Sequence, residues 1–148
     1  MDKMTPQQRH NCMSRIRGKA TKPELRVRNW LWHHGYRYRL NVNSVPGRPD
    51  IVLRRYRTAI FVNGCFWHGH ESCGMYVLPK SNTEFWIAKV KRNKERDKCN
   101  YKDLHDAGWN VIVIWECQLK KNVIDETMRS VEHTLSCNLL KMYKTSSK

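Results

Sequence analysis

The chain has 148 residues with 28 Lys and Arg against 13 Asp and Glu, a formal net charge of +15, so a polyanion such as nucleic acid is the first partner to consider. This length suits one compact domain, and 40% hydrophobic residues with 6 Trp exclude a disordered chain. The longest apolar run, Val111–Trp115, is far below the roughly 20 residues that span a bilayer, and Met1–Pro6 lacks an apolar signal core. We therefore expect a soluble, cytoplasmic protein.

The first half of the chain predicts one helix and three strands. The helix is expected to begin at Thr21, a candidate cap with Glu24 three residues later, and to end at Gly35. Apolar and basic residues alternate over 36–42, which is typical of a half-buried strand with one aromatic and one basic face. A turn-rich stretch then leads into the short apolar runs 51–53 and 59–62, which we expect to pair as a hairpin.

The second half predicts a loop, two helices and one strand. Residues 63–79 are rich in Gly, Cys and His and indicate a structured loop, after which Ser81 and Glu84 predict a capping box that opens a long helix ending at Gly108. The apolar run Val111–Trp115 is expected to be the central strand, covered on both faces by helices. An amphipathic helix and a polar tail at 144–148 should follow. The inward stripes expected for the two helices are Trp86, Val90, Asn93, Asp97, Tyr101 and Leu104, then Ile124, Met128, Val131, Leu135, Leu139 and Met142. This order predicts a single α/β domain whose mixed sheet is flanked by helices.

Cysteine and histidine residues gather in the expected loop. Cys65, His68, His70 and Cys73 fall within a nine-residue span, and Cys117 follows the expected central strand. Thiolates and imidazoles are ligands that suit tetrahedral Zn²⁺, and a site filled by protein ligands would be structural. Five candidates compete for four places, so the spacing leaves open which His is a ligand. Buried thiols without a metal are the alternative interpretation.

Asp50 follows Pro49 and opens a short apolar strand beside the loop that carries the histidines. A carboxylate at this edge is suited to Mg²⁺, which proteins hold with one or two carboxylates together with a substrate phosphate. An ordinary turn carboxylate is the alternative for a lone Pro-Asp pair.

Taken together, the motifs resemble those of the very short patch repair (Vsr) endonuclease family, a branch of the PD-(D/E)xK nucleases with a restriction-endonuclease-like fold. The resemblance covers about residues 9–120, and its most specific part is the run Gly64–His68. The segments that carry it are Thr21–Leu25, Pro46–Asp50, Phe61–His70, Thr83–Trp86, Asn93–Asp97 and Gly108–Cys117. It implies one endonuclease domain over residues 1–148 that nicks one DNA strand 5′ of the T in a T:G mismatch, leaving a 5′-phosphate and a 3′-hydroxyl.

The resemblance also implies metal ligands. Catalytic Mg²⁺ would be held by Asp50 and the backbone carbonyl of Val62, with Glu24 positioning the ion through a metal-bound water. Structural Zn²⁺ would be held by Cys65, His70, Cys73 and Cys117.

Proton transfer would then fall to His68 as general base or acid. The best-known family pattern has His where this chain has Asn63, so a mechanism with two histidines does not carry over whole. Because an amide cannot accept a proton at neutral pH, we expect Asn63 to position a water while His68 carries the proton.

Aromatic and basic residues supply candidate DNA contacts. Phe66, Trp67 and Trp86 lie on or beside a polar loop, where exposed rings suggest stacking on bases. The resemblance assigns them intercalation at the mismatch. It also implies that Lys89 and Asn93 read the mispaired bases and that Met13 and Ile16 contact the opposite groove.

Basic residues, mostly in an N-terminal segment at 1–20, are expected to contact phosphates: Arg15, Arg17, Lys19 and Lys22. The remaining tryptophans in regular apolar patterns, Trp30, Trp109 and Trp115, are expected in the core.

The expected partner is therefore double-stranded DNA with a T:G mismatch, acted on by a monomer in the nucleoid of a prokaryotic cell, with mismatch-repair proteins as candidate partners. Two competing hypotheses remain open. A zinc-stabilised DNA-binding module would bind without Mg²⁺ and without cleavage. A nuclease of the same fold with another DNA substrate would share the active site and differ in the duplex that it prefers.

Overall fold

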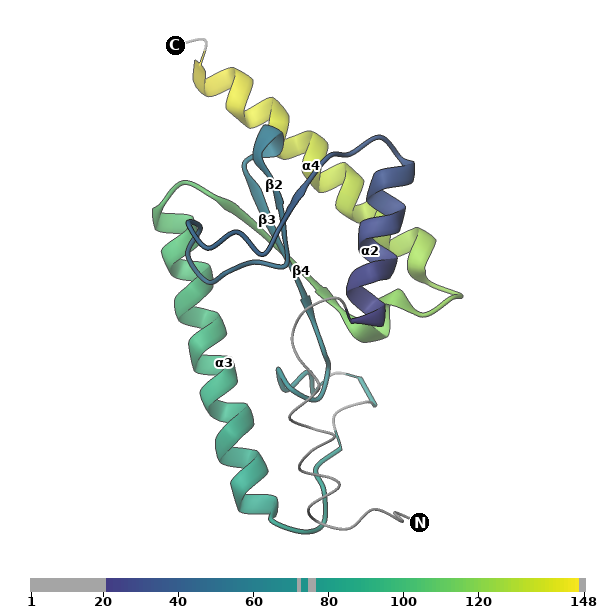
Figure 1. Ribbon diagram of the computed structural model, residues 1–148, viewed down its shortest axis with the longest axis vertical. Helices are drawn as coiled ribbons and strands as arrows, with labels where there is room; N and C mark the ends of the chain where they lie inside the picture. The colour runs from purple at the N-terminus through teal and green to yellow at the C-terminus, as the bar shows by residue number, and fades with distance from the viewer. Residues whose placement is uncertain (1–20, 72, 75–76, 147–148) are drawn as a thin grey trace.

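A four-stranded mixed sheet lies between two layers of helices (Figure 1). The computed structural model describes residues 21–71, 73–74 and 77–146. The strands are Arg39–Leu40 (β1), Ile51–Leu53 (β2), Thr58–Asn63 (β3) and Asn110–Trp115 (β4), in the order β1-β2-β3-β4. β1, β2 and β3 pair antiparallel, and β3 pairs parallel to β4. The predicted α/β class, the mixed sheet and the hairpin of β2 and β3 are confirmed.

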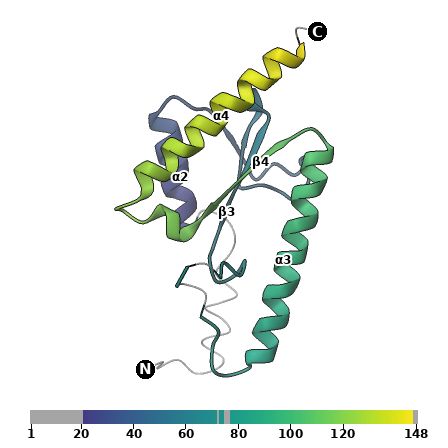
Figure 2. The same cartoon turned by 180° about the vertical axis from the view of Figure 1, so that it is seen from behind.

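Helices α2 (Lys22–His33) and α4 (Ile124–Ser146) cover one face of the sheet, and α3 (Thr83–Asp106) lies on the other, as Figure 2 shows from behind. Alternate residues of a strand point to opposite faces, so each strand contributes to two apolar clusters. Ile51, Leu53 and Ile60 pack with α2 and α4, whereas Val52 and Phe61 pack with α3. None of the helices within the described residues is long and apolar enough to cross a membrane.

The prediction that Val111–Trp115 forms the central strand is wrong, since within the described sheet β4 pairs only with β3 at the edge. Helices nevertheless cover both of its faces, because Ile114 packs in the cluster of α2 and α4 while Val111 packs against that of α3. An uninterrupted apolar run indicates that both faces of a strand are buried. Helices can bury both faces of an edge strand just as they bury those of a central strand, so the run does not determine the position in the sheet.

Strand β1 is shorter than the predicted 36–42. Tyr36 is buried and Tyr38 half-buried, as the alternation indicates, but only Arg39 and Leu40 pair with β2. Asn41 adopts a left-handed backbone conformation with φ 49°, which ends the extended segment.

The helix ends follow the sequence in part. Thr21 caps α2 as predicted, its hydroxyl accepting the Glu24 N–H at 3.4 Å. The capping box predicted at Ser81 is wrong, since α3 begins at Thr83 after Asn82, whose φ is 55° and whose side chain makes no capping bond. Instead, Thr83 Oγ1 donates to the carbonyl of Pro79 at 2.9 Å. Helix α4 continues through residues 144–146, which the sequence placed in a polar tail.

Candidate active site and metal centre

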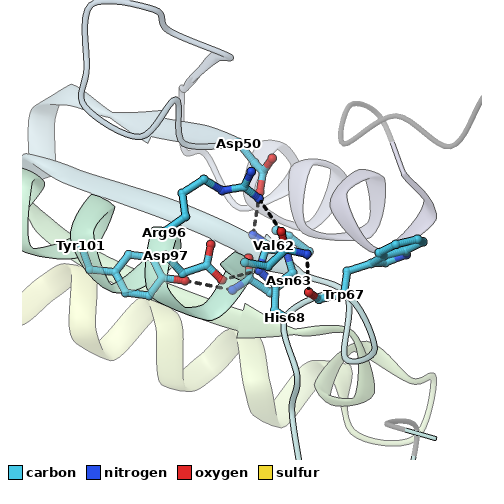
Figure 3. Close-up of polar contacts among 9 residues, drawn as sticks. Asp50, Val62, Asn63, Trp67, His68, Arg96, Asp97 and Tyr101 are labelled. Atoms are coloured by element: carbon cyan, nitrogen blue, oxygen red, sulfur yellow. Dashed lines mark hydrogen bonds and ion pairs between the residues drawn. The ribbon is translucent and has the colours of Figure 1, made fainter. Parts of the chain in front are cut away.

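A cavity of about 550 Å³ opens where the ends of β2 and β3 face α3 (Figure 3). Asp50, Val62, Asn63 and His68, which the sequence assigned to catalysis or to Mg²⁺, all line it. Arg48, Arg96 and Asp97 contribute further charged groups to the wall. The fold thus joins a turn, a strand end, a loop and a helix around one solvent-accessible space.

Asp50 is held at the start of β2 by the neighbouring strand. Its Oδ2 accepts the backbone N–H of Val62 at 2.7 Å, and the side chain is only partly accessible. Burial raises the pKa of Asp50 to about 6, because removal from water disfavours the carboxylate. The hydrogen bond from Val62 lowers that pKa, the charge of Glu24 raises it further, and His68 and Arg28 lower it.

His68 is oriented from α3. Its Nδ1 donates to the carboxylate of Asp97, which lies on the inward stripe of that helix (Figure 3). A ring whose Nδ1 carries the proton keeps Nε2 as the nitrogen that can accept one. The sequence placed Asp97 on the inward stripe and in the motif Asn93–Asp97 but gave it no role, although an acidic residue on the inward face of a basic helix was a usable signal.

Asn63 is buried, with 3% of its surface exposed, at the end of β3. Its Nδ2 donates to the hydroxyl of Tyr101 at 2.9 Å. Burial raises the pKa of Tyr101 to about 12, so this phenol is neutral at physiological pH, and the bond from Asn63 lowers the pKa against that effect. Sequence reasoning missed the contact because Tyr101 lies on α3, 38 positions further along the chain.

Glu24 does not line the cavity, although it is the nearby carboxylate whose charge acts on Asp50. It is 1% exposed on α2 and forms an ion pair with Arg28 one turn later. Its charge still acts on Asp50, as the raised pKa of that residue shows. Two carboxyl groups therefore lie close together here, with Arg28 balancing one of them.

Cys65, His70, Cys73 and Cys117 converge near the end of β4, with one potential ligand atom of each within 4.8 Å of the others. His68 is turned to Asp97 instead, so the structure selects His70 from the two candidate histidines. Burial raises the pKa of Cys65 to about 12 and raises that of Cys117. Three sulfur atoms and one imidazole nitrogen in this arrangement form a donor set that fits a tetrahedral metal ion.

Trp115 belongs to this centre rather than to the core as predicted. Its ring stacks on that of His70, with centroids 4.1 Å apart and planes 7° from parallel. Trp30 and Trp109 are partly buried and pack against the two apolar clusters, in line with their prediction.

The three predicted intercalating rings contact one another between the loop and the start of α3. Phe66 and Trp67 lie 5.2 Å apart, and the ring of Trp86 lies 5.7 Å from the first and 5.8 Å from the second. All three are partly buried rather than fully exposed. In Figure 3 the ring of Trp67 extends away from Asp50 and His68.

Two further predicted DNA contacts lie beside these rings. Lys89 Nζ lies 5.6 Å from the ring centre of Trp67. The amide of Asn93 donates to the carbonyl of Trp67 at 2.9 Å and accepts from Arg96 at 3.2 Å, so it holds the loop on α3. Met13, Ile16, Arg15, Arg17 and Lys19 lie outside the described residues.

Residues 1–74 match the sequence profile of the family described as "DNA mismatch endonuclease Vsr". A relative from Neisseria meningitidis, "Type II nicking enzyme V.NmeAIP", is 48% identical over 123 residues, which cover 83% of this chain and 87% of the relative. "Type II nicking enzyme V.XorIIP" of Xanthomonas oryzae is 43% identical, over 80% of this chain and 86% of the relative. "DNA mismatch endonuclease Vsr" of Escherichia coli is 39% identical, over 81% of this chain and 78% of the relative.

Proposed function

This chain belongs to the Vsr family of DNA mismatch endonucleases, and from that membership we propose that it nicks one DNA strand 5′ of the T in a T:G mismatch by Mg²⁺-dependent hydrolysis. The observation that carries the mechanism is the meeting of Asp50 and His68 in one cavity, with His68 oriented by Asp97. A carboxylate for a divalent ion and a positioned imidazole for the proton are the groups that phosphodiester hydrolysis needs.

Mg²⁺ would bind the carboxylate of Asp50 and the backbone carbonyl of Val62. Asp50 forms no ion pair with the residues that the structure describes, and its burial makes a cation a favourable partner for the charged form. Oxygen donors of this kind suit Mg²⁺, which when bound supplies positive charge that stabilises the transferring phosphate. Glu24 would position the ion through a metal-bound water.

His68 would move the proton through Nε2. It would take the proton of the attacking water or give one to the leaving 3′ oxygen, and the other proton exchanges with solvent. The water oxygen bonds to phosphorus as the P–O3′ bond breaks, and a 5′-phosphate and a 3′-hydroxyl form. Asp97 is the positioning residue, since it fixes the orientation of the ring through Nδ1. Asn63, fixed by Tyr101, would orient water in the same cavity.

Zn²⁺ would be held by Cys65, His70, Cys73 and Cys117 and would be structural, because a site filled by four protein ligands keeps no open position for water. It would tie the loop that carries His68 to the end of β4.

Mismatch recognition is proposed to use Phe66, Trp67 and Trp86 as wedges between base steps. Unstacking costs a few kcal/mol and costs least at a mispaired step, which favours the mismatch. Lys89 and Asn93 would read the mispaired bases, Met13 and Ile16 would contact the opposite groove, and Arg15 and Arg17 would bind phosphates.

We also propose that the protein acts as a monomer, that it is associated with the nucleoid in the cytoplasm of a prokaryotic cell, and that mismatch-repair proteins are further partners.

The mechanism is tested by nicking of a labelled T:G duplex in Mg²⁺ and in EDTA, with the wild type and Asp50→Ala. We expect single-strand cleavage by the wild type in Mg²⁺ alone, no cleavage by the variant, and DNA binding by both. Binding without cleavage by the wild type would favour a non-catalytic module, and cleavage by the variant would refute the role of Asp50.

Because two of the relatives above are named type II nicking enzymes, a same-fold nuclease with another DNA substrate is the second candidate function.

A further inference from the structure

A second cleft, of about 180 Å³, lies at the opposite end of β2 from the active site. Asp50 precedes that strand and Arg54 follows it. With a rise of about 3.3 Å per residue, the two positions are separated by about 13 Å. The residues that line the cleft are Arg37, Tyr38, Arg39, Val52, Arg54 and Arg55.

The charge in this cleft is all of one sign. Its lining holds four arginines and no carboxylate. None of the four guanidinium groups forms an ion pair with another residue in the described part of the chain. All four side chains are exposed. Repulsion among the four positive charges destabilises the folded protein, and a bound anionic ligand would offset that repulsion.

Local contacts orient the Arg37 side chain and fix the backbone of Arg54 and Arg55. The guanidinium of Arg37 stacks on the ring of Trp32 at 3.7 Å and donates to the carbonyl of Tyr36 at 3.0 Å. Trp32 itself is 52% exposed. Arg54 and Arg55 lie on a short 3₁₀ turn that is closed by the Arg57 N–H donating to the carbonyl of Arg54 at 3.0 Å. The guanidinium of Arg37, which is already oriented, therefore loses less conformational entropy when it binds an anion.

We propose that this arginine cleft binds backbone phosphates of the DNA that flanks the cleavage site. Guanidinium groups match phosphate oxygens in a bidentate geometry. The separation of about 13 Å is under half of the roughly 34 Å of one duplex turn, so one duplex is long enough to reach both sites. The inference rests on the proposed function insofar as DNA is the ligand. It adds a contact on the β1 and β2 side of the sheet, away from the loop and α3.

The test uses Arg54→Ala combined with Arg55→Ala. The control, Lys102→Ala with Arg129→Ala, removes the same charge from exposed positions that line neither cleft. Binding is measured across salt concentrations on two T:G duplexes, of about one and about three helical turns. Each lost phosphate contact lowers the slope of log K against log salt by about 0.9. We expect a loss of about 1 to 2 in slope for the cleft variant on both duplexes, relative to the control variant, because half of one turn already exceeds the separation of about 13 Å. The rate of nicking at saturating DNA should be unchanged.

Equal behaviour of the cleft and control variants on the long duplex would overturn the proposal. Binding of polyglutamate that requires Arg54 and Arg55, without an effect on DNA, would also overturn it and assign the cleft to an acidic polypeptide. Thermal unfolding checks that the variants fold, and Arg55→Glu alone replaces the pair if the turn is disturbed. Failure of the wild type to nick the short duplex would count against the proposed function and leave the binding comparison intact.

Discussion

The ionised form of Asp50, which the proposed mechanism requires, is unfavourable for the fold. Its pKa is raised from 3.8 to about 6, so the stability that the neutral carboxyl contributes is present below pH 3.8 and is lost as the pH rises through 6. At neutral pH the ionised carboxylate therefore destabilises the folded protein, by about 3 kcal/mol at most from the size of the shift. A bound cation would remove that cost.

Asp50→Asn is therefore expected to abolish nicking and to raise the melting temperature at pH 8 in EDTA. At pH 5 the gain should shrink, because the carboxyl group of the wild type is then mostly neutral. Thermal unfolding at both pH values measures this, with Glu95→Gln on the exposed face of α3 as the control. A variant that is no more stable than the wild type at pH 8 would contradict the account of Asp50.

Asp97 should act on the rate through the orientation of His68. Asp97→Asn is expected to lower kcat by about 10² to 10⁴, the contribution of one positioned general acid or base, while DNA affinity stays within a few-fold. Asp97→Glu should restore part of the rate. Single-turnover nicking and a separate binding titration give the two quantities, and a loss of affinity that explains the whole loss of rate would argue for a merely structural role.

The contact between the loop and α3 is what brings the proposed catalytic groups together. Gly69 has φ +63°, and a Cβ there would lie 2.8 Å from Val90 Cγ1 and 2.3 Å from Lys94 Cε. Gly69→Ala should therefore strain the loop that carries His68 and His70, at a cost of about 1 to 3 kcal/mol, and slow nicking. Gly74→Ala in the same loop meets no atom within 4 Å and should be close to neutral. Equal melting temperatures and rates for the two variants would contradict this packing.

Sequence patterns predicted the elements well and their partners less well. The alternation over 36–42 and the apolar run at 111–115 indicated strands, because the local order of apolar and polar residues determines which side chains of a strand are buried. The edge position of β4 depends on pairing with a distant strand, which no local pattern records, and the end of β1 follows from the left-handed conformation of Asn41, which the alternation does not register. The same holds within the site: Asp50 and His68 are recognisable by residue type and motif, whereas Asp97 and Tyr101 act through contacts 29 and 38 positions away.

For the whole molecule, the cluster of Cys65, His70, Cys73 and Cys117 should couple metal content to stability. It joins the loop after β3 to the end of β4, so Zn²⁺ binding free energy would contribute to folding. Cys73→Ser is expected to lower bound zinc and the melting temperature together, whereas Cys99→Ser, at an exposed position on α3, should change neither. Metal analysis with thermal unfolding checks both. Wild-type protein that carries no zinc after purification without chelators would contradict the structural role.

As a member of the Vsr family, this chain is expected to cut DNA at a mismatch. The most direct measurement is the rate of nicking of a labelled duplex with a single T:G mismatch, beside its fully paired twin, in Mg²⁺. We expect cleavage of the mismatched duplex on one strand, 5′ of the T, and little or none of the paired twin. Equal cleavage of both duplexes, or cleavage of the paired one alone, would contradict the assignment and favour a nuclease with another DNA substrate.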